Sequence, residues 1–186
     1  MIAIAVLFYF VLATIAYTYI GFPLLVALRA MVLRKPIKAQ QITPPVSLIV
    51  AAHNEEDSIE DKLLNILQLD YPADRLQVIV ASDGSTDRTG EIVSRYADRG
   101  VELLTLPRMG KAYALNQAVA KASGDVLVFS DANSMYATDA IRQLAAPFAD
   151  ETVGGVAING IVNPMMTNAI KVTATKANVP IGIWIA

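Results

Sequence analysis

Residues 1–28 of the chain are predominantly apolar and carry no charged side chain, and the first charged residue is Arg29. A helix of this length spans about 42 Å, compared with roughly 30 Å for the hydrocarbon core of a bilayer. The segment lacks the polar face of a helix that packs against a soluble core. The pattern therefore predicts a transmembrane helix, which Gly21 and Pro23 bend or end.

Basic residues follow this segment directly, at Arg29, Arg34, Lys35 and Lys38, whereas nothing basic precedes it except the amino terminus. The positive-inside rule then predicts a single-pass protein of the cell membrane, with its N-terminus outside and the rest in the cytoplasm. A cleaved signal peptide is the alternative, but such peptides have a basic start and a shorter apolar core. We assign residues 1–35 to an anchor with a basic flank and residues 36–45 to a linker.

From residue 46 onward, apolar runs alternate with segments of helical spacing. The runs predict buried strands at 46–52, 76–81, 101–106 and 126–130, with a fifth at 153–157. Between the first two strands, Ile59, Leu63 and Ile66 recur at helical intervals. Alternating strands and helices predict an α/β fold with a mainly parallel sheet. In such sheets, ligands bind beyond the carboxyl ends of the strands.

Acidic residues occupy three of these strand ends, and we expect Glu55, Asp83 and Asp131 to converge along one rim of the sheet. Asp83 can accept a hydrogen bond from a nucleobase, although the residues after it also suit a turn and a helix cap. Glu55 can hold a ribose or a base. His53, the single histidine, is left without a role.

Asp131 and Asn133 place two oxygen ligands at the exposed end of a buried strand. This pair suits Mg²⁺ or Mn²⁺ bridging a diphosphate, and a simple strand-to-loop turn is the alternative. Arg108 and Lys111 precede or open a predicted helix, where phosphate is favoured. A solvated loop is the alternative for this basic pair.

The composition excludes several functional classes. A net charge of −2 gives no basic excess for a nucleic-acid backbone, so we expect no nucleic-acid partner. The absence of cysteine excludes disulfides, thiol nucleophiles and cysteine metal sites. Neither a Walker A pattern nor Gly-x-Gly-x-x-Gly occurs, which disfavours ordinary nucleoside triphosphatases and dinucleotide dehydrogenases.

Five motifs in order resemble those of the family 2 glycosyltransferases: VSLIVAAHNEE at 46–56, DYP at 70–72, SDGSTD at 82–87, GKAYALN at 110–116 and FSDAN at 129–133. This family has the GT-A fold, which is Rossmann-like, and includes the cellulose, chitin and hyaluronan synthases. The resemblance covers about residues 46–157, which we treat as a nucleotide-sugar-binding half-domain. It implies inverting transfer from a nucleotide-sugar, most often a UDP-sugar, in polysaccharide or glycolipid synthesis.

The resemblance also implies roles for individual residues. Ala52, Asn54 and Glu55 match the first nucleotide contact of the family, and Asp83 matches the acid that holds the base. Lys111 and Asn116 match the segment that lines the uridine pocket.

The family's Asp-x-Asp motif, which meets the diphosphate and the metal, corresponds to Asp131 and Asn133. The second acid is asparagine here, which implies weaker binding of Mg²⁺ or Mn²⁺. The implied partners are a nucleotide-sugar donor, a saccharide or lipid acceptor, and the membrane.

The tail at 158–186 differs in character from the rest of the chain. It has no acidic residue and no clear periodicity, so the catalytic base that the family carries downstream has no counterpart. We therefore expect the C-terminal part of the fold to be missing, and we hypothesise a tail translated out of frame. Sequencing codons 150–190 tests this; a naturally divergent tail or a fragment is the alternative.

Two other functions stay open at this point. The first is a catalytically inactive, truncated membrane protein that at most binds nucleotide. The second is a nucleotidyltransferase, which is disfavoured because no Gly-rich triphosphate loop lies near the first strand.

Overall fold

The computed structural model describes residues 1–33, 37–160 and 170–176. Arg34 and Lys35 of the expected basic flank, and most of the expected tail, lie outside these residues. The chain divides into two compact units, Met1–Ile37 and Lys38–Ala186, which are described separately.

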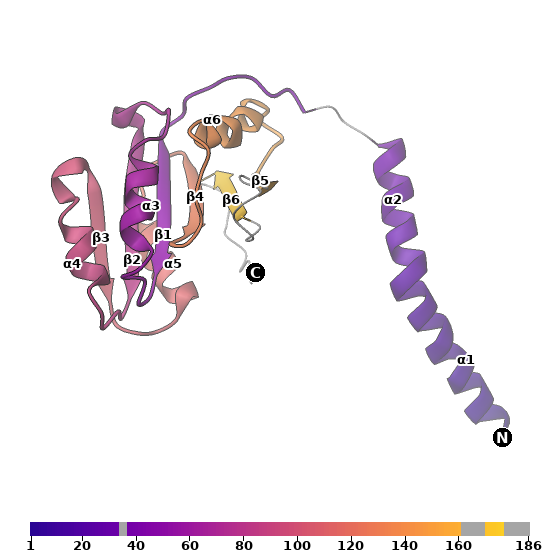
Figure 1. Ribbon diagram of the computed structural model, residues 1–186. Coiled ribbons are helices and arrows are strands. Elements are labelled where there is room, and N and C mark those ends of the chain that lie inside the picture. The colour runs from indigo at the N-terminus through magenta and orange to yellow at the C-terminus, as the bar shows by residue number, and fades with distance from the viewer. Residues whose placement is uncertain (34–36, 161–169, 177–186) are drawn as a thin grey trace. The chain divides into compact units, whose positions relative to one another are not determined.

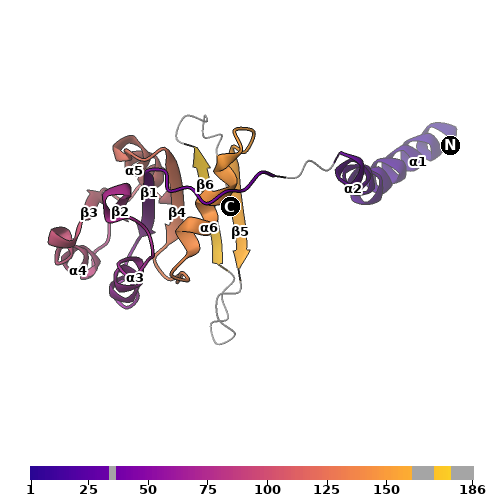
Figure 2. The ribbon, with the colours of Figure 1, turned by 90° about the horizontal axis from the view of Figure 1, so that it is seen from above.

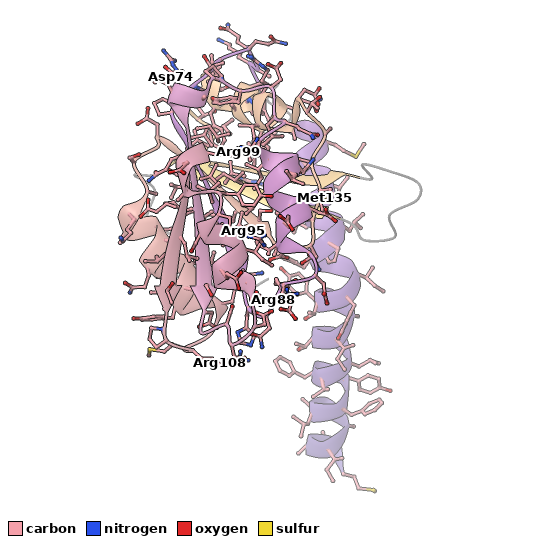
Figure 3. All side chains as sticks on the ribbon, turned by 60° about the vertical axis from the view of Figure 1, so that its left-hand side comes forward. Asp74, Arg88, Arg95, Arg99, Arg108 and Met135 are labelled. Atoms are coloured by element: carbon pink, nitrogen blue, oxygen red, sulfur yellow. The ribbon has the colours of Figure 1, made fainter. Side chains whose placement is uncertain are left out.

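The first unit is a helix long and apolar enough to cross a membrane, Ile2–Val32, with a mean hydropathy of 2.1. It comprises α1 (Ile2–Ala16), a π-helical turn η1 (Tyr17–Gly21) and α2 (Phe22–Val32). Its apolar side chains project outward along its length (Figure 3).

The helix does not end at Pro23, although Gly21 and Pro23 predicted a bend or an end there. A proline lacks the N–H group and crowds the carbonyl four residues earlier. The π turn directly before α2 is wider than an α turn, which accommodates this crowding.

The second unit is built on a six-stranded sheet with the order β3-β2-β1-β4-β6-β5 (Figures 1 and 2). The strands are β1 (Val46–Ala52), β2 (Leu76–Asp83), β3 (Val101–Leu106), β4 (Val126–Asp131), β5 (Gly155–Gly160) and β6 (Ile170–Lys176). The first four are parallel, whereas β6 pairs antiparallel with β4 and β5. The expected α/β fold with a mainly parallel sheet is confirmed.

Helices cover both faces of this sheet. On one face α3 (Ile59–Ile66), α4 (Thr89–Ser94) and α6 (Ala140–Ala145) share an apolar core with alternate residues of the strands. On the other face α5 (Lys111–Lys121) packs Ala114 and Ala118 against Ile49 and Ile79. Short 3₁₀ turns follow or precede these elements: η2 (Ala73–Arg75), η3 (Ala97–Arg99) and η4 (Ala146–Ala149).

The strand order reverses direction at β1. The chain proceeds from β1 to β2 and β3 on one side, and β4 then returns to the other side of β1. Right-handed crossovers then require α5 to lie on the face opposite α3 and α4, as it does. Such a reversal of strand order is where α/β sheets bind ligands, beyond the carboxyl ends of the strands.

The register of the parallel strands brings their carboxyl ends to one edge. Ala51 is opposite Asp131 on β4, and Ala52 is opposite Ser82 on β2. The acidic residues that follow or end these strands therefore share one rim.

The sheet continues past residue 157, where we predicted the end of the nucleotide-sugar-binding half-domain. Strand β6 inserts between β4 and β5, although we saw no periodicity in that part of the tail. Antiparallel pairing at this side supplies the hydrogen bonds that the edge of β4 needs. The out-of-frame origin of the tail stays a hypothesis.

Candidate functional site

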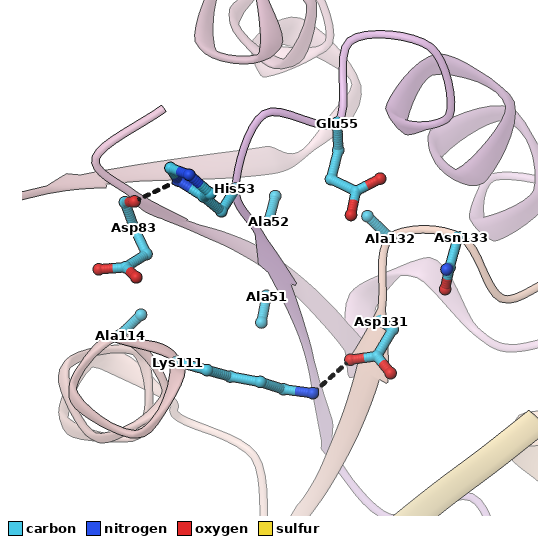
Figure 4. A pocket seen from close by; sticks show the side chains of 10 residues that line it. All are labelled: Ala51, Ala52, His53, Glu55, Asp83, Lys111, Ala114, Asp131, Ala132 and Asn133. Carbon is cyan, nitrogen blue, oxygen red and sulfur yellow. Dashed lines mark hydrogen bonds and ion pairs between the residues drawn. The ribbon is translucent and has the colours of Figure 1, made fainter. Parts of the chain in front are cut away.

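A cavity of about 310 Å³ lies beyond the carboxyl ends of β1, β2 and β4. Glu55, Asp83 and Asp131 all line it, as we expected from the strand ends (Figure 4). The other lining residues come from the same strand ends and from α5: Ala51, Ala52, His53, Lys111, Ala114, Ala132 and Asn133. Three acids, one lysine and one amide thus surround a common space.

Asp83 is buried, with 7% of its surface exposed, and it braces the loop before α5. Its Oδ1 accepts hydrogen bonds from the backbone N–H groups of Met109 (2.8 Å) and Gly110 (3.0 Å). Gly84, with φ of 60°, approaches this loop so closely that a Cβ atom would lie 2.7 Å from the backbone nitrogen of Arg108. Asp83 and Gly84 therefore hold Lys111 at the cavity by fixing the loop before it.

His53, to which we gave no role, also lines the cavity. Its Nδ1 lies 2.7 Å from the backbone oxygen of Asp83 (Figure 4). A carbonyl oxygen only accepts, so Nδ1 carries a hydrogen and Nε2 is the ring nitrogen left for another partner. A polar residue directly after a buried strand is the signal that could have identified it.

Glu55 is fixed at the start of the segment that leads into α3. Its backbone N–H donates to Thr89 Oγ1 at 2.8 Å, and Ser58 Oγ donates to Glu55 Oε2 at 2.6 Å. One carboxylate oxygen of Glu55 is therefore held by the protein, while the side chain points into the cavity (Figure 4).

Two of the expected nucleotide contacts do not line the cavity. Asn54 adopts a left-handed backbone with φ of 53°, and its Oδ1 accepts a hydrogen bond from the Thr86 N–H at 2.8 Å. Asn54 thereby connects the loop after β1 to the loop after β2. Asn116 is exposed on α5. A direct nucleotide contact by either residue stays a prediction.

Asp131 and Asn133 lie on the cavity rim together with Lys111. The Nζ of Lys111 is 2.6 Å from Asp131 Oδ1, so an ammonium ion faces the carboxylate proposed as a metal ligand. No group of three or more His, Cys, Asp or Glu side chains suited to a metal occurs among the described residues. The oxygen donors of Asp131 and Asn133 nevertheless fit Mg²⁺ or Mn²⁺, because these ions are held by one or two carboxylates together with phosphates and water.

A buried lysine next to this loop was not among the predicted site residues. Lys62 of α3 has no exposed surface, and its ammonium group lies against Ser134 and the ring of Tyr136. Burial lowers the pKa of Lys62 to about 7, and the nearby Asp131 carboxylate opposes that shift. The signal was its spacing, three residues after Ile59 and four before Ile66, which places it on the buried side of the helix.

Comparison with known proteins agrees with the resemblance in the motifs. The model of glycosyl transferase family 2 matches residues 47–180, which extends beyond the point where we placed the end of the family's similarity. The chain is 33% identical over 139 residues to the probable glycosyltransferase YdaM of Bacillus subtilis and 35% identical over 120 residues to the beta-monoglucosyldiacylglycerol synthase of Synechocystis. It is 32% identical over 125 residues to the poly-beta-1,6-N-acetyl-D-glucosamine synthase of Staphylococcus aureus.

These alignments cover 72%, 62% and 66% of this chain but 32%, 25% and 29% of the relatives. The chain therefore spans about a third or less of the length of the curated relatives it matches.

Two solved structures show the same fold. The mannosyltransferase PcManGT of Pyrobaculum calidifontis, in complex with GDP-Man and Mn²⁺, has a TM-score of 0.64 and 37% identity, with 78% of this chain and 45% of that chain covered. A fragment of S. aureus TarS in complex with UDP-GlcNAc has a TM-score of 0.51 and 28% identity, with 54% and 30% covered. The expected GT-A-like fold is confirmed.

Proposed function

This chain belongs to the family 2 glycosyltransferases. We propose that it binds a nucleotide-sugar donor in the cavity beyond β1, β2 and β4, and that this donor is a UDP-sugar. The observation that carries the proposal is the convergence of Glu55, Asp83 and Asp131 on that single cavity. The complexes of PcManGT with GDP-Man and of TarS with UDP-GlcNAc support a nucleotide-sugar as the ligand class.

In this proposal, different side chains of the cavity contact different parts of the donor. Among the described residues, the Gly110 N–H is the one donor to Asp83 Oδ2, at 3.0 Å, so this oxygen keeps lone pairs for a base N–H group. Glu55 keeps one oxygen for a ribose hydroxyl, because Ser58 occupies the other. Lys111 is placed to exchange its contact with Asp131 for the diphosphate.

Asp131 and Asn133 are the residues that would hold Mg²⁺ or Mn²⁺. The ion, when bound, neutralises the negative charge of the diphosphate as it leaves. The Mn²⁺ in the PcManGT complex supports a divalent cofactor. Because Asn133 is a neutral ligand, we expect the ion to bind mainly together with the nucleotide.

We further propose transfer with inversion to a saccharide or lipid acceptor at the cell membrane. The relatives that make a glucosyldiacylglycerol and poly-N-acetylglucosamine support this acceptor class. The apolar helix Ile2–Val32 supports a single-pass anchor. The basic residues from Arg29 onward support an N-terminus outside and a sheet domain in the cytoplasm. Protease treatment of intact cells should leave the sheet domain uncut; digestion from outside contradicts this orientation.

Calorimetric titration of the purified chain tests donor binding. We expect UDP-glucose, UDP-GlcNAc or GDP-mannose to bind in Mn²⁺ and to bind more weakly in EDTA. Absence of binding by all three donors contradicts the proposed function. Measuring sugar transfer in the same samples separates a working transferase from the alternative of an inactive, nucleotide-binding membrane protein.

A further inference from the structure

A completely buried lysine contacts the loop that carries the proposed metal ligands. The Nζ of Lys62 donates to the backbone oxygen of Ser134 at 2.5 Å and lies 3.7 Å from the centre of the Tyr136 ring. Burying an ammonium group costs several kcal/mol unless partners compensate for the lost water. A methionine would fill the same space without that cost, so the charge or the contact has another use.

The contact with Ser134 fixes the backbone of Asp131. Ser134 directly follows Asn133, and its Oγ donates to the carbonyl oxygen of Asp131 at 2.9 Å. Ser130 Oγ donates to the same carbonyl at 3.0 Å. Lys62 thus holds the residue that closes the turn containing both proposed ligands.

A second residue of α3 grips the end of this loop. Asn65 Nδ2 donates to the backbone oxygen of Tyr136 at 2.9 Å, and the Tyr136 N–H donates to Asn65 Oδ1 at 2.8 Å. Two attachments from one helix, three residues apart, leave the loop little freedom to rearrange. The segment that leads into α3 begins at Glu55, the proposed ribose contact. Helix α3 therefore connects Glu55 to the loop that carries the proposed metal ligands.

We propose that Lys62 is a positioning residue, which holds the 131–134 turn in the shape that lets Asp131 and Asn133 share one divalent ion. This inference rests on the proposed function of the cavity. An amide oxygen is a weaker ligand than a carboxylate, so metal binding at Asn133 depends strongly on correct placement.

The direction in which Lys62→Met changes Mn²⁺ affinity distinguishes a positioning role from a purely electrostatic one. Removing a cation near a divalent ion reduces repulsion, so charge alone would make Mn²⁺ bind more tightly in Lys62→Met. Loss of positioning makes Mn²⁺ bind less tightly. Lys62→Met removes the cost of burying a charge but leaves the Ser134 carbonyl oxygen without this donor. These effects oppose one another, so the fold should persist.

The test compares UDP affinity in Mn²⁺ and in EDTA for the full chain, Lys62→Met and the control Lys121→Met. Lys121 is an exposed lysine of α5, whose Nζ lies 3.5 Å from Glu102. We expect the gain in UDP affinity due to Mn²⁺ to fall about 10-fold or more in Lys62→Met, the range seen for residues that orient metal ligands. Its affinity in EDTA should not fall, and Lys121→Met should behave as the unmodified chain.

Other outcomes overturn the inference. An unchanged or larger Mn²⁺ effect in Lys62→Met excludes positioning and leaves the proposed function intact. A parallel loss of Tm and of affinity in EDTA indicates a purely structural lysine. If Lys62→Met does not fold, Lys62→Gln provides the same comparison with a polar side chain. Failure of the unmodified chain to bind UDP at all contradicts the proposed function itself.

Discussion

Replacing Asp131 by alanine is expected to lower UDP affinity in Mn²⁺ by about 100-fold or more. Residues that only orient metal ligands already contribute 10- to 100-fold to metal affinity, and Asp131 is a proposed ligand itself. The substitution also removes the partner of Lys111, but this ion pair is exposed and contributes little to stability. Calorimetric titration in Mn²⁺ measures the loss, and the same titration in EDTA should show a much smaller effect.

Asp125→Ala is the matched control for this substitution. Asp125 is exposed and precedes β4, whereas Asp131 ends that strand at the cavity. We expect Asp125→Ala to bind UDP as the unmodified chain does. Equal affinities of the two variants in Mn²⁺ would exclude Asp131 as a metal ligand.

Replacing Asp83 by alanine is expected to weaken UDP binding equally in Mn²⁺ and in EDTA. The carboxylate is lost as a base contact and as the acceptor for the Met109 and Gly110 N–H groups. A hydrogen bond to a charged group contributes about 1.5–3 kcal/mol, which corresponds to roughly a 10- to 150-fold change in affinity. Independence from the metal is the property that distinguishes Asp83 from Asp131.

The control for Asp83 lies just before the other end of β2. Asp74 is exposed and precedes β2, and Figure 3 shows it far from Arg108, which neighbours Asp83 through Gly84. Asp74→Ala should leave UDP affinity unchanged. If Asp83→Ala retains full affinity, the base-binding role assigned to this end of the cavity is wrong.

The parallel half of the fold was accessible from the sequence because its signals are local. Val46–Ala52 is a run of apolar residues interrupted only by Ser47, and the structure begins and ends β1 at the same two residues. A central strand buried on both faces leaves few alternatives to such a pattern. The shared rim of Glu55, Asp83 and Asp131 then follows from parallel register alone.

Strand β6 could not be found in the same way. Its partners are β4 and β5, and it lies between them in the sheet but after both in the chain. Pairing of this kind depends on residues that are distant in the sequence. Ile170–Lys176 mixes polar and β-branched residues and lacks the apolar run that would predict a buried strand.

Lys62 and Asn54 show why side-chain roles were harder to predict than strands. The ammonium of Lys62 contacts a carbonyl 72 residues away and the ring of Tyr136, and these distant partners compensate for its burial. Asn54 matches a nucleotide-binding motif, yet its amide oxygen accepts from Thr86, 32 residues away. A motif gives the residue type, whereas tertiary partners decide which group remains for a ligand.

Hydrogen exchange of the full chain with and without saturating UDP and Mn²⁺ tests most directly whether one nucleotide diphosphate is gripped by three strand ends. The account predicts slower exchange in four segments together: 53–56, 84–86, 109–111 and 132–134. Protection of only one of these segments, or protection of the turns at 73–75 and 97–99 before β2 and β3, contradicts it.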